Sequence, residues 1–537
     1  MCLAIVCSGH SVSEQALFSE SAPEHNCIHH LLSKEYPPQM SEFHPDDPHQ
    51  HAATEFNLQG PSHSMQFEAS HLNAYEQPDN VIDGWHGIRI YLDFSFANTF
   101  TARADAALLS KYKLSARLTQ SVRRYFQSVL QVNYYQKFNF DPMGRSCYKH
   151  QVAKFSKYID LYIVISPEND PQTNYFAAAT SCFLSARDKR PTMGAYILNF
   201  AFLKDAPLFS FLYFSTFAHE FTHILGFSND LFGSFMDLKT GKVLQNVVGK
   251  QTIGGIKSSV YNVITMEDVV RYARSYFNCP TLVGVPLENE GGEGTAGSHW
   301  EKTFLPHEYM NPTTANPGII SEFTFSFLRG TGWYRTYTGG AQRFDWGKGA
   351  GCNYLNHCPP QHQGTCTDSQ VGFATCSADY DAKAVCTKDS SYGTGCPRKN
   401  PQQHSCFINN GQPLLRNENY GPYSRCFIWT MNNVTPENFP EPRCHMTYCD
   451  TNGAVIIKYG TSWVRCTRSG EVISTIESTH KLVCPNIQDF CDEMNNRCPE
   501  DCNAQGVCTE SGTCICHHGF SGAYCNQSDP NAQLFNP

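Results

Sequence analysis

Residues 209–227, with the sequence FSFLYFSTFAHEFTHILGF, decide the fold of this chain. Apolar residues dominate the stretch and predict a buried helix over residues 207–225. His219 and His223 lie one helical turn apart, so both imidazoles can reach a single tetrahedral metal ion. Glu220 can face the water in the open position of such an ion and accept its proton. The stretch therefore predicts a zinc site of the hydrolytic kind.

Two other interpretations of this short motif exist. The histidines could be a buried pair satisfied by hydrogen bonds, or they could bind a purely structural zinc ion. Against the first, the polar stripe of the apolar helix includes Thr216 as well as both histidines and Glu220. Against the second, structural zinc sites usually fill all four positions with protein ligands. A catalytic metal site is the favoured interpretation.

The ends of the helix indicate where a third ligand must come from. Asp205 is a suitable cap and Gly226 a suitable stop. Gly226 follows His223 by three residues and lets the chain turn sharply, so that another ligand can return from downstream. Residues 227–229 contain no histidine. The third ligand is therefore expected beyond a long, partly helical insertion at residues 230–298.

A known family becomes recognisable downstream of that insertion. His299 precedes Trp300, and Met310 follows His299 by eleven residues. Residues 323–334, FTFSFLRGTGWY, then read as a helix that closes on Gly-Trp-Tyr. With the split helix motif, this pattern resembles the leishmanolysins, zinc proteases of the metzincin type. Three upstream segments are also similar to the family: residues 160–165, 178–182 and 190–199. In all, the resemblance covers roughly residues 25–490.

This resemblance implies a complete metal site. It implies one Zn²⁺ per chain, Glu220 as general base, Met310 as the apolar floor, and three ligands, which are His219, His223 and His299. His307, three residues before Met310, is a competing ligand. Its context and spacing match the family pattern less well than those of His299.

The chain as a whole is predicted to be of the mixed α+β class. Apolar patterns indicate strands over residues 88–94, 161–165 and 195–200, and a helix over residues 112–132. The resemblance implies a zincin-like metzincin domain, a twisted mixed sheet with an active-site helix. We expect six regions: leader remnant and pro-region 1–80, catalytic subdomain 81–229, inserted central domain 230–298, third ligand with Met-turn and helix 299–338, cysteine-rich domain 339–490, and a terminal module with polar tail 491–537.

Residues 24–30, EHNCIHH, resemble the family's pro-region segment, in which a lone cysteine is proposed to block the metal. A Cys27 thiolate is a good zinc ligand and would displace the attacking water. The alternative is a disulfide from Cys27 to another cysteine. His29 and His30 are expected to be surface residues. The surrounding residues 8–80 are polar and predict a loosely structured pro-region.

Cysteine usage indicates an exported protein. The chain has 25 cysteines, 19 of them after Gly351, a density that is rare in a reducing cytosol. Without Cys2, Cys7 and Cys27, 25 − 3 = 22 cysteines remain. This number is even, so a mature chain that begins after Cys27 could pair every cysteine. The apolar start, residues 1–7, is short and lacks a basic residue, so it predicts at most a signal-peptide remnant. No stretch is long and apolar enough to predict a transmembrane segment.

The last six cysteines, with Cys-x-Cys and a Gly pair, resemble an epidermal-growth-factor-like (EGF-like) module. Sequence alone allows fifteen ways to pair six cysteines. The resemblance implies first–third, second–fourth and fifth–sixth: Cys498–Cys508, Cys502–Cys514 and Cys516–Cys525. Such modules usually provide contact or spacing, so cell-surface or matrix contact is expected here.

These features predict a secreted zinc metalloendopeptidase, made as a latent precursor, that acts on protein or peptide substrates. The alternative is an adhesion protein that keeps the scaffold and the zinc, but a pure binding protein has no need for Glu220. The 40 basic and 49 acidic residues are dispersed and give a net charge of −9. No basic stripe indicates a nucleic-acid partner.

Overall fold

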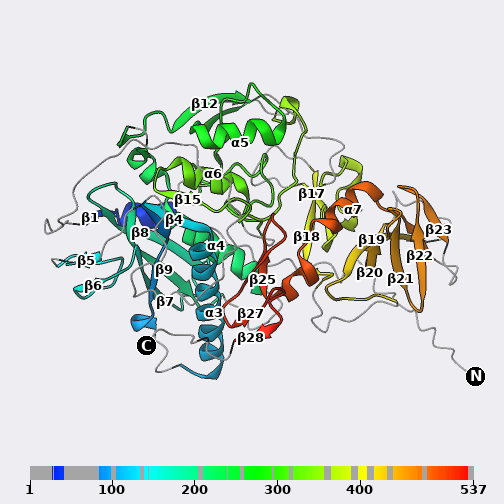
Figure 1. Cartoon of the computed structure of the whole chain (residues 1–537), viewed down its shortest axis with the longest axis horizontal. Helices are drawn as coiled ribbons and strands as arrows, with labels where there is room; N and C mark the ends of the chain where they lie inside the picture. The colour runs from blue at the N-terminus through cyan, green and yellow to red at the C-terminus, as the bar shows by residue number, and fades with distance from the viewer. Residues whose placement is uncertain are drawn as a thin grey trace, which may run out of the picture.

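The computed structural model describes most of the chain, in segments. These are residues 27, 29–41, 84–97, 104–133, 138–142, 144–173, 175–202, 210–238, 240–253, 259–292, 295–313, 318–355, 364–388, 397–407, 417–431, 440–474, 480–529 and 532. Within them the protein is a mixed α/β structure with a disulfide-rich C-terminal region, as the sequence predicts (Figure 1).

A five-stranded sheet forms the centre of the N-terminal half, in the order β1-β8-β9-β7-β3. Its strands are β1 (Gln39–Ser41), β3 (Ile90–Asp93), β7 (Leu161–Glu168), β8 (Ala177–Ser185) and β9 (Pro191–Asn199). β3, β7 and β9 run parallel, β8 is antiparallel to β9, and β1 is parallel to β8. The predicted strands at residues 88–94, 161–165 and 195–200 are therefore confirmed within a few residues.

Two helices cover one face of this sheet. α3 (Ala106–Val129) and α4 (Ser210–Leu225) pack against each other, and α4 also packs on β8 and β9 (Figure 1). Alternate residues of β7 divide between two cores: Ile163 and Ile165 join the cluster with these helices, whereas Tyr162 and Val164 join a smaller one. Both faces of the sheet are thus buried, and this explains why β8 and β9 lack a polar alternation.

The predicted helix at residues 112–132 has different ends in the structure. It begins at Ala106, because the Asp105 carboxylate accepts a hydrogen bond from the Leu108 amide and caps the first turn. It ends at Val129, because residues 130–133 form β4 (Leu130–Asn133). β4 pairs with β2 (Trp85–Gly87) and β15 (Tyr334–Thr336), so strand pairing takes over from the helical pattern.

The pro-region is more ordered near Cys27 than its sequence predicts. α1 (His29–Glu35) packs on β8, and β1 adds a strand to the edge of the central sheet. A loosely structured pro-region is therefore a wrong expectation for residues 29–41. The polar local sequence gives little sign of this order, because tertiary contacts with β8 create it.

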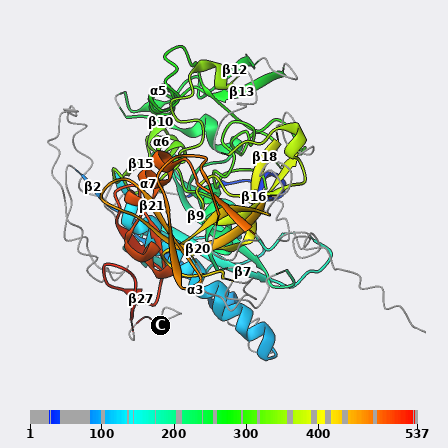
Figure 2. The same ribbon diagram turned by 90° about the vertical axis from the view of Figure 1, so that its right-hand side faces the viewer.

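The insertion is partly helical, as predicted, but it also contains small sheets. Its elements are the 3₁₀ helix η3 (Asn229–Ser234), β10 (Met236–Asp237), β11 (Lys242–Val243), β12 (Val248–Ile253), β13 (Ser259–Ile264), α5 (Glu267–Phe277) and β14 (Val285–Pro286). α5 packs against α6 (Glu322–Gly330), the helix predicted after Met310. β12 and α5 lie at the same end of the molecule in two perpendicular views (Figures 1 and 2).

The cysteine-rich region is built mainly from strands. A three-stranded sheet contains β16 (Ala374–Cys376), β17 (Ala382–Lys388) and β18 (Pro397–Ser405). A six-stranded sheet follows, and α7 (Ile487–Asn495) packs on it; its strands are β19 (Ser424–Met431), β20 (Glu441–Cys449), β21 (Val455–Tyr459), β22 (Ser462–Cys466), β23 (Val472–Ser474) and β24 (His480–Val483). Strand pairing therefore organises this region, and disulfides such as Cys376–Cys426 link its two sheets.

Every described cysteine after Cys27 is in a disulfide, whereas Cys27 itself is free and buried. The three disulfides expected for the terminal module are all present: Cys498–Cys508, Cys502–Cys514 and Cys516–Cys525. Cys2 and Cys7 lie outside the described residues.

Residues 498–529, called the terminal module below, pack against the helices of the N-terminal half. The module contains η6 (Pro499–Ala504), β25 (Gly506–Cys508), β26 (Cys514–Cys516), β27 (Phe520–Ser521) and β28 (Gln527–Ser528). Its red ribbon lies beside α3 in both views (Figures 1 and 2), and β26 contacts α3. Val507 belongs to the main hydrophobic core.

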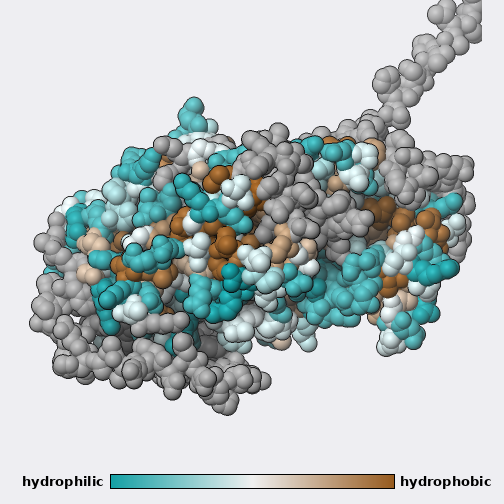
Figure 3. Space-filling view, turned by 90° about the horizontal axis from the view of Figure 1, so that it is seen from above, coloured by the Kyte–Doolittle hydropathy of each residue, from teal (hydrophilic) through white to brown (hydrophobic). Residues whose placement is uncertain are grey.

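On the face seen from above, apolar side chains reach the surface in several separate groups among polar ones (Figure 3). In the part of the chain that the structure describes, no helix combines the length and apolar character needed to cross a membrane.

Candidate metal centre

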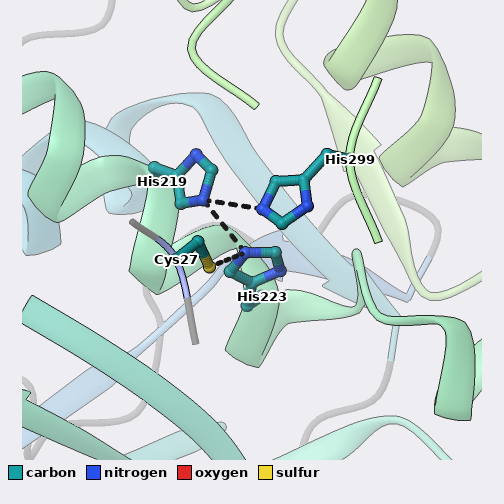
Figure 4. Close-up of side chains that lie close together, drawn as sticks. All are labelled: Cys27, His219, His223 and His299. Atoms are coloured by element: carbon teal, nitrogen blue, oxygen red, sulfur yellow. Dashed lines mark hydrogen bonds between the residues drawn. The ribbon is translucent and has the colours of Figure 1, made fainter. Parts of the chain in front are cut away.

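Four buried side chains from three separate parts of the chain converge at one point (Figure 4). The Nε2 atom of His219 lies 3.0 Å from that of His223 and 3.3 Å from that of His299. The Cys27 Sγ atom lies 3.3 Å from His223 Nε2. All four candidate ligand atoms lie within 4.8 Å of one another, and all four residues are buried.

The backbone fixes the tautomer of each histidine. Nδ1 of His219 lies 2.6 Å from the Tyr309 carbonyl oxygen, Nδ1 of His223 lies 2.6 Å from that of Phe227, and Nδ1 of His299 lies 2.7 Å from that of Thr295. A carbonyl only accepts, so each Nδ1 carries the hydrogen and each Nε2 presents a lone pair. Burial lowers the pKa of His223 well below its usual value, with nearby histidines as a further cause, and this keeps the ring neutral.

Three converging lone pairs repel one another unless a cation lies between them. At tetrahedral zinc, bonds of about 2.0–2.1 Å place neighbouring ligand nitrogens about 3.4 Å apart, close to the two Nε2 distances given above. Three imidazoles and one thiol are also ligands that zinc prefers. The residues present therefore fit a zinc ion.

Local structure explains how α4 presents its two histidines. The i, i+4 spacing places them on one face of the helix, and Gly226 ends it with a φ of +139°. The Gly226 and Phe227 amides both donate to the Thr222 carbonyl, which turns the chain back. This turn delivers the Phe227 carbonyl to His223 Nδ1, so the glycine predicted as a stop also orients a candidate ligand.

His299 reaches the cluster from the far side of the insertion. The Trp300 amide donates to the Met310 carbonyl at 3.0 Å, which joins the two sequence features that identify the family pattern. Met310 is fully buried, and its neighbour Tyr309 accepts the hydrogen bond from His219. The predicted turn around Met310 is thus linked to His219 through the Tyr309 carbonyl and to the neighbour of His299 through the Met310 carbonyl.

His307, the competing ligand, lies outside this convergent group. Its half-buried ring lies against Trp346, with ring centroids 6.0 Å apart, and its φ is +66°. Burial lowers the pKa of His307 to about 4. The geometry therefore brings together His219, His223 and His299, and leaves His307 outside the group.

Glu220 lies beside the candidate ligands and is fully buried. Its Oε1 atom is 3.9 Å from His219 Nε2. Burial raises the pKa of Glu220 well above its usual value, although hydrogen bonds from the Cys27 side chain and the Ala179 backbone lower it. Glu220 and the Cys27 thiol therefore lie together beside the histidine cluster.

His29 is a correction to the sequence analysis, which expects it at the surface. Only 1% of His29 is exposed, and its ring stacks on His223 with centroids 4.1 Å apart and planes 2° from parallel. Its Nδ1 atom lies 2.7 Å from the Ala179 carbonyl oxygen on β8. Its neighbourhood in the sequence, rich in histidine and polar residues, carries no signal for this contact. For His30 no side-chain position is described.

Sequence reasoning also missed the carbonyl acceptors of Tyr309, Phe227 and Thr295, because every residue carries a carbonyl and no motif marks one. The carboxylate of Glu308, which accepts a hydrogen bond from the Met310 amide, was missed as well. Its position two residues before Met310 is the only signal that the sequence offers.

Comparisons with known proteins place a family match over the same region of the chain. The family model described as Leishmanolysin matches residues 148–390, a region that contains all three histidines and Glu220. The chain is similar to the leishmanolysin-like peptidase of Drosophila pseudoobscura pseudoobscura, with 27% identity over 379 residues, which is 52% of this chain and 55% of that protein. The leishmanolysin-like peptidase of Drosophila melanogaster is 35% identical over 167 residues, 26% of this chain and 24% of that protein.

A third relative has a different name. The ciliated left-right organizer metallopeptidase of Homo sapiens is 26% identical over 345 residues, covering 58% of this chain and 42% of that protein. The chain thus spans about half or less of the length of these curated relatives. The matches support the leishmanolysin family, a family of zinc metallopeptidases, for this chain. They name peptidases, and none of them favours the adhesion alternative.

Proposed function

We propose that this protein is a secreted zinc metalloendopeptidase with a metzincin catalytic domain, made as a latent precursor. The observation that carries the proposal is the set of three Nε2 lone pairs beside Glu220, because a pure binding site needs no such carboxylate. The ten disulfides among the described residues support the secreted location. The disulfide pairing in the terminal module supports an EGF-like fold, and we propose a contact role for the module by analogy with that fold.

The residues of the chain have distinct roles in the proposed hydrolysis. His219, His223 and His299 would hold one zinc ion, which when bound lowers the pKa of a water and polarises a peptide carbonyl. Glu220 would accept the proton of the attacking water and deliver it to the leaving amine as the peptide C–N bond breaks. Burial raises the pKa of Glu220 above its usual value.

Peptide cleavage by the processed protein tests this proposal. Incubation with a peptide library, with and without a zinc chelator, should show cleaved bonds only without the chelator. Glu220→Ala should lower the cleavage rate by about 10²–10⁴-fold and leave the zinc content unchanged, because a base is lost and no ligand. Cleavage that continues with the chelator, or in Glu220→Ala, would contradict the proposed mechanism.

Latency is proposed to rest on Cys27. Its Sγ atom lies in the group of converging ligand atoms, and its thiol is hydrogen-bonded to Glu220, so it occupies the side from which water would attack. Burial raises the pKa of the Cys27 thiol, and the Glu220 carboxylate raises it further. A bound metal supplies the positive charge that makes the thiolate favourable, so the block depends on zinc.

Contacts beyond Cys27 keep the pro-segment in place. His29 stacks on His223, the Ser33 hydroxyl donates to the Asp230 carboxylate, and β1 extends the sheet at β8. These contacts cover the edge strand beside the candidate metal centre. Removal of the segment would therefore uncover both the metal position and the strand edge.

A pair of variants separates a thiol block from simple coverage. Cys27→Ala should give an uncleaved precursor with clear peptidase activity, and thiol-modifying mercurials should activate the wild type. Ser33→Ala is the matched control, because it removes an anchor of the same segment without touching the metal position, and it should stay latent. If Cys27→Ala is as latent as the control, coverage alone explains latency and the thiol has no switching role.

A further inference from the structure

Glu308 is a buried carboxylate that the proposed hydrolysis does not use. Only 1% of it is exposed. Its Oε1 atom accepts hydrogen bonds from the hydroxyls of Ser321, at 2.8 Å, and Thr324, at 2.6 Å. Its Oε2 atom accepts a 2.5 Å bond from the Met310 amide. The carboxylate thus connects the turn around Met310 to the start of another element.

That element is α6, and its N-terminus suits a negative charge. Ser321 is the N-cap residue of α6, and Thr324 lies in its first turn. The first amides of a helix and its dipole favour an anion at this end. Burial raises the pKa of Glu308 to about 7, while the bonds from Thr324, Met310 and Ser321 act in the opposite direction. The helix start therefore offsets part of the cost of burying this carboxylate.

One chain of contacts links Glu308 to His299. The Thr324 hydroxyl that donates to Glu308 also accepts the Trp300 indole N–H at 2.9 Å. Trp300 follows His299, and its backbone amide donates to the Met310 carbonyl. Both the side chain and the backbone of Trp300 are therefore tied to groups that Glu308 holds.

A second chain of contacts links Glu308 to His219. Tyr309, the residue between Glu308 and Met310, accepts the Nδ1 hydrogen of His219 on its carbonyl oxygen. Its phenolic oxygen lies 2.8 Å from the Thr222 hydroxyl of α4. Because Glu308 fixes the Met310 amide, it also fixes the peptide whose carbonyl sets the His219 tautomer.

We propose that Glu308 is a positioning residue that holds His219 and His299, which come from separate segments, in the geometry that binds the metal. This inference rests on the proposed zinc site. Glu308 does not touch the substrate or the reacting atoms; it acts through Met310, Tyr309 and Trp300.

Metal-binding measurements on the full-length protein test this role without relying on activity. Glu308→Gln keeps the size of the side chain but leaves a single acceptor oxygen, so the Met310 amide and the two hydroxyls can no longer all donate to this side chain. We expect zinc affinity to fall by about 10–100-fold, as for other residues that orient metal ligands. The visible absorption bands of the Co²⁺-substituted protein should also shift, since they report ligand geometry.

Two further variants keep the test decisive. Glu418→Gln is the matched control, because Glu418 is a buried carboxylate remote in sequence that accepts from the Cys444 amide and pairs with Lys383. It should change stability but not zinc affinity or the Co²⁺ spectrum. If Glu308→Gln fails to fold, Thr324→Val decides, since it removes the hydroxyl that joins Glu308 to Trp300 but keeps the carboxylate and its bond from the Met310 amide. It should weaken zinc binding in the same direction.

The outcomes separate the two proposals. Wild-type protein that binds no zinc overturns the proposed function. Wild-type protein that binds zinc, together with Glu308→Gln or Thr324→Val variants whose zinc affinity and Co²⁺ spectrum match the wild type, overturns only the role of Glu308.

Discussion

Backbone carbonyls select the metal-binding form of the three histidines. Each of the three histidines directs Nδ1 to its own carbonyl oxygen: His219 to Tyr309, His223 to Phe227 and His299 to Thr295. The Nε2 lone pairs that remain point at one another, and only a cation relieves their repulsion. Folding of the surrounding chain thus sets both the position and the tautomer of each ligand.

The choice between the two downstream histidines can be tested directly. His299→Ala removes one of three converging nitrogens, so the purified protein should contain roughly a tenth of the wild-type zinc or less and lose peptidase activity. His307→Ala is the control of the same residue type, and it should keep most of both. Elemental analysis of the two variants decides, and zinc loss confined to His307→Ala would mean that the third ligand is wrongly assigned.

At the residue scale, the sequence predicts those parts of the site that depend on the spacing of side chains within one helix. The i, i+4 pair His219 and His223 follows from helix geometry, whereas His299 could be chosen over His307 only through the resemblance to a family. His29 was misjudged, because its burial depends on a ring 194 residues away in the chain, His223. Local composition does not contain that contact.

At the scale of elements, the end of α4 is the most constrained point near the metal centre. Gly226 has a φ of +139°, and an added Cβ would meet the Trp333 ring at 3.0 Å. Its turn also supplies the Phe227 carbonyl to His223. A side chain at this position would strain the backbone, and it would also displace the packed Trp333 ring.

Gly226→Ala should therefore lower the free energy of unfolding by roughly 2–4 kcal/mol and weaken zinc binding. Gly233→Ala is a matched control in the following 3₁₀ helix, because a Cβ there meets nothing within 4 Å. Chemical denaturation of both variants gives the comparison. Equal stability of Gly226→Ala and Gly233→Ala would show that the turn carries no strain.

The elements that the sequence predicts best are those whose apolar periodicity matches their burial. α3, β7 and α4 belong to this group. β8, AAATSCFLS, was not predicted as a strand from its pattern, because all nine residues are buried and small residues replace an alternation. The ordered segment at α1 and β1 was missed, because pairing with β8 creates it and its own sequence does not.

At the scale of the whole molecule, the terminal module packs on the N-terminal half, which carries His219 and His223 on α4 and is called the catalytic half below. The His517 ring stacks on Phe214 of α4 with centroids 4.7 Å apart. The His518 amide donates to the Ser121 hydroxyl at 2.9 Å, and the Arg124 guanidinium donates to the Phe520 carbonyl at 3.2 Å. These contacts join the terminal module to α3 and to α4, the helix that carries His219 and His223.

His517→Ala should therefore destabilise the catalytic half as well as the module. Loss of a buried ring contact should cost roughly 1–2 kcal/mol, and amide hydrogen exchange in α3 and α4 should become faster. Tyr524→Ala is the control, since Tyr524 is 42% exposed on the same module. Unchanged exchange in both helices would show that the module is only tethered to the catalytic half.

The measurement that tests the central claim most directly is zinc K-edge X-ray absorption on the full-length precursor. The account predicts about one zinc per chain, bound by three imidazole nitrogens and one sulfur, with the sulfur lost after the pro-segment is removed. A precursor that binds no zinc, or zinc bound without three imidazole nitrogens, would contradict the metal centre. Zinc with three nitrogens but no sulfur would contradict the role of Cys27 alone.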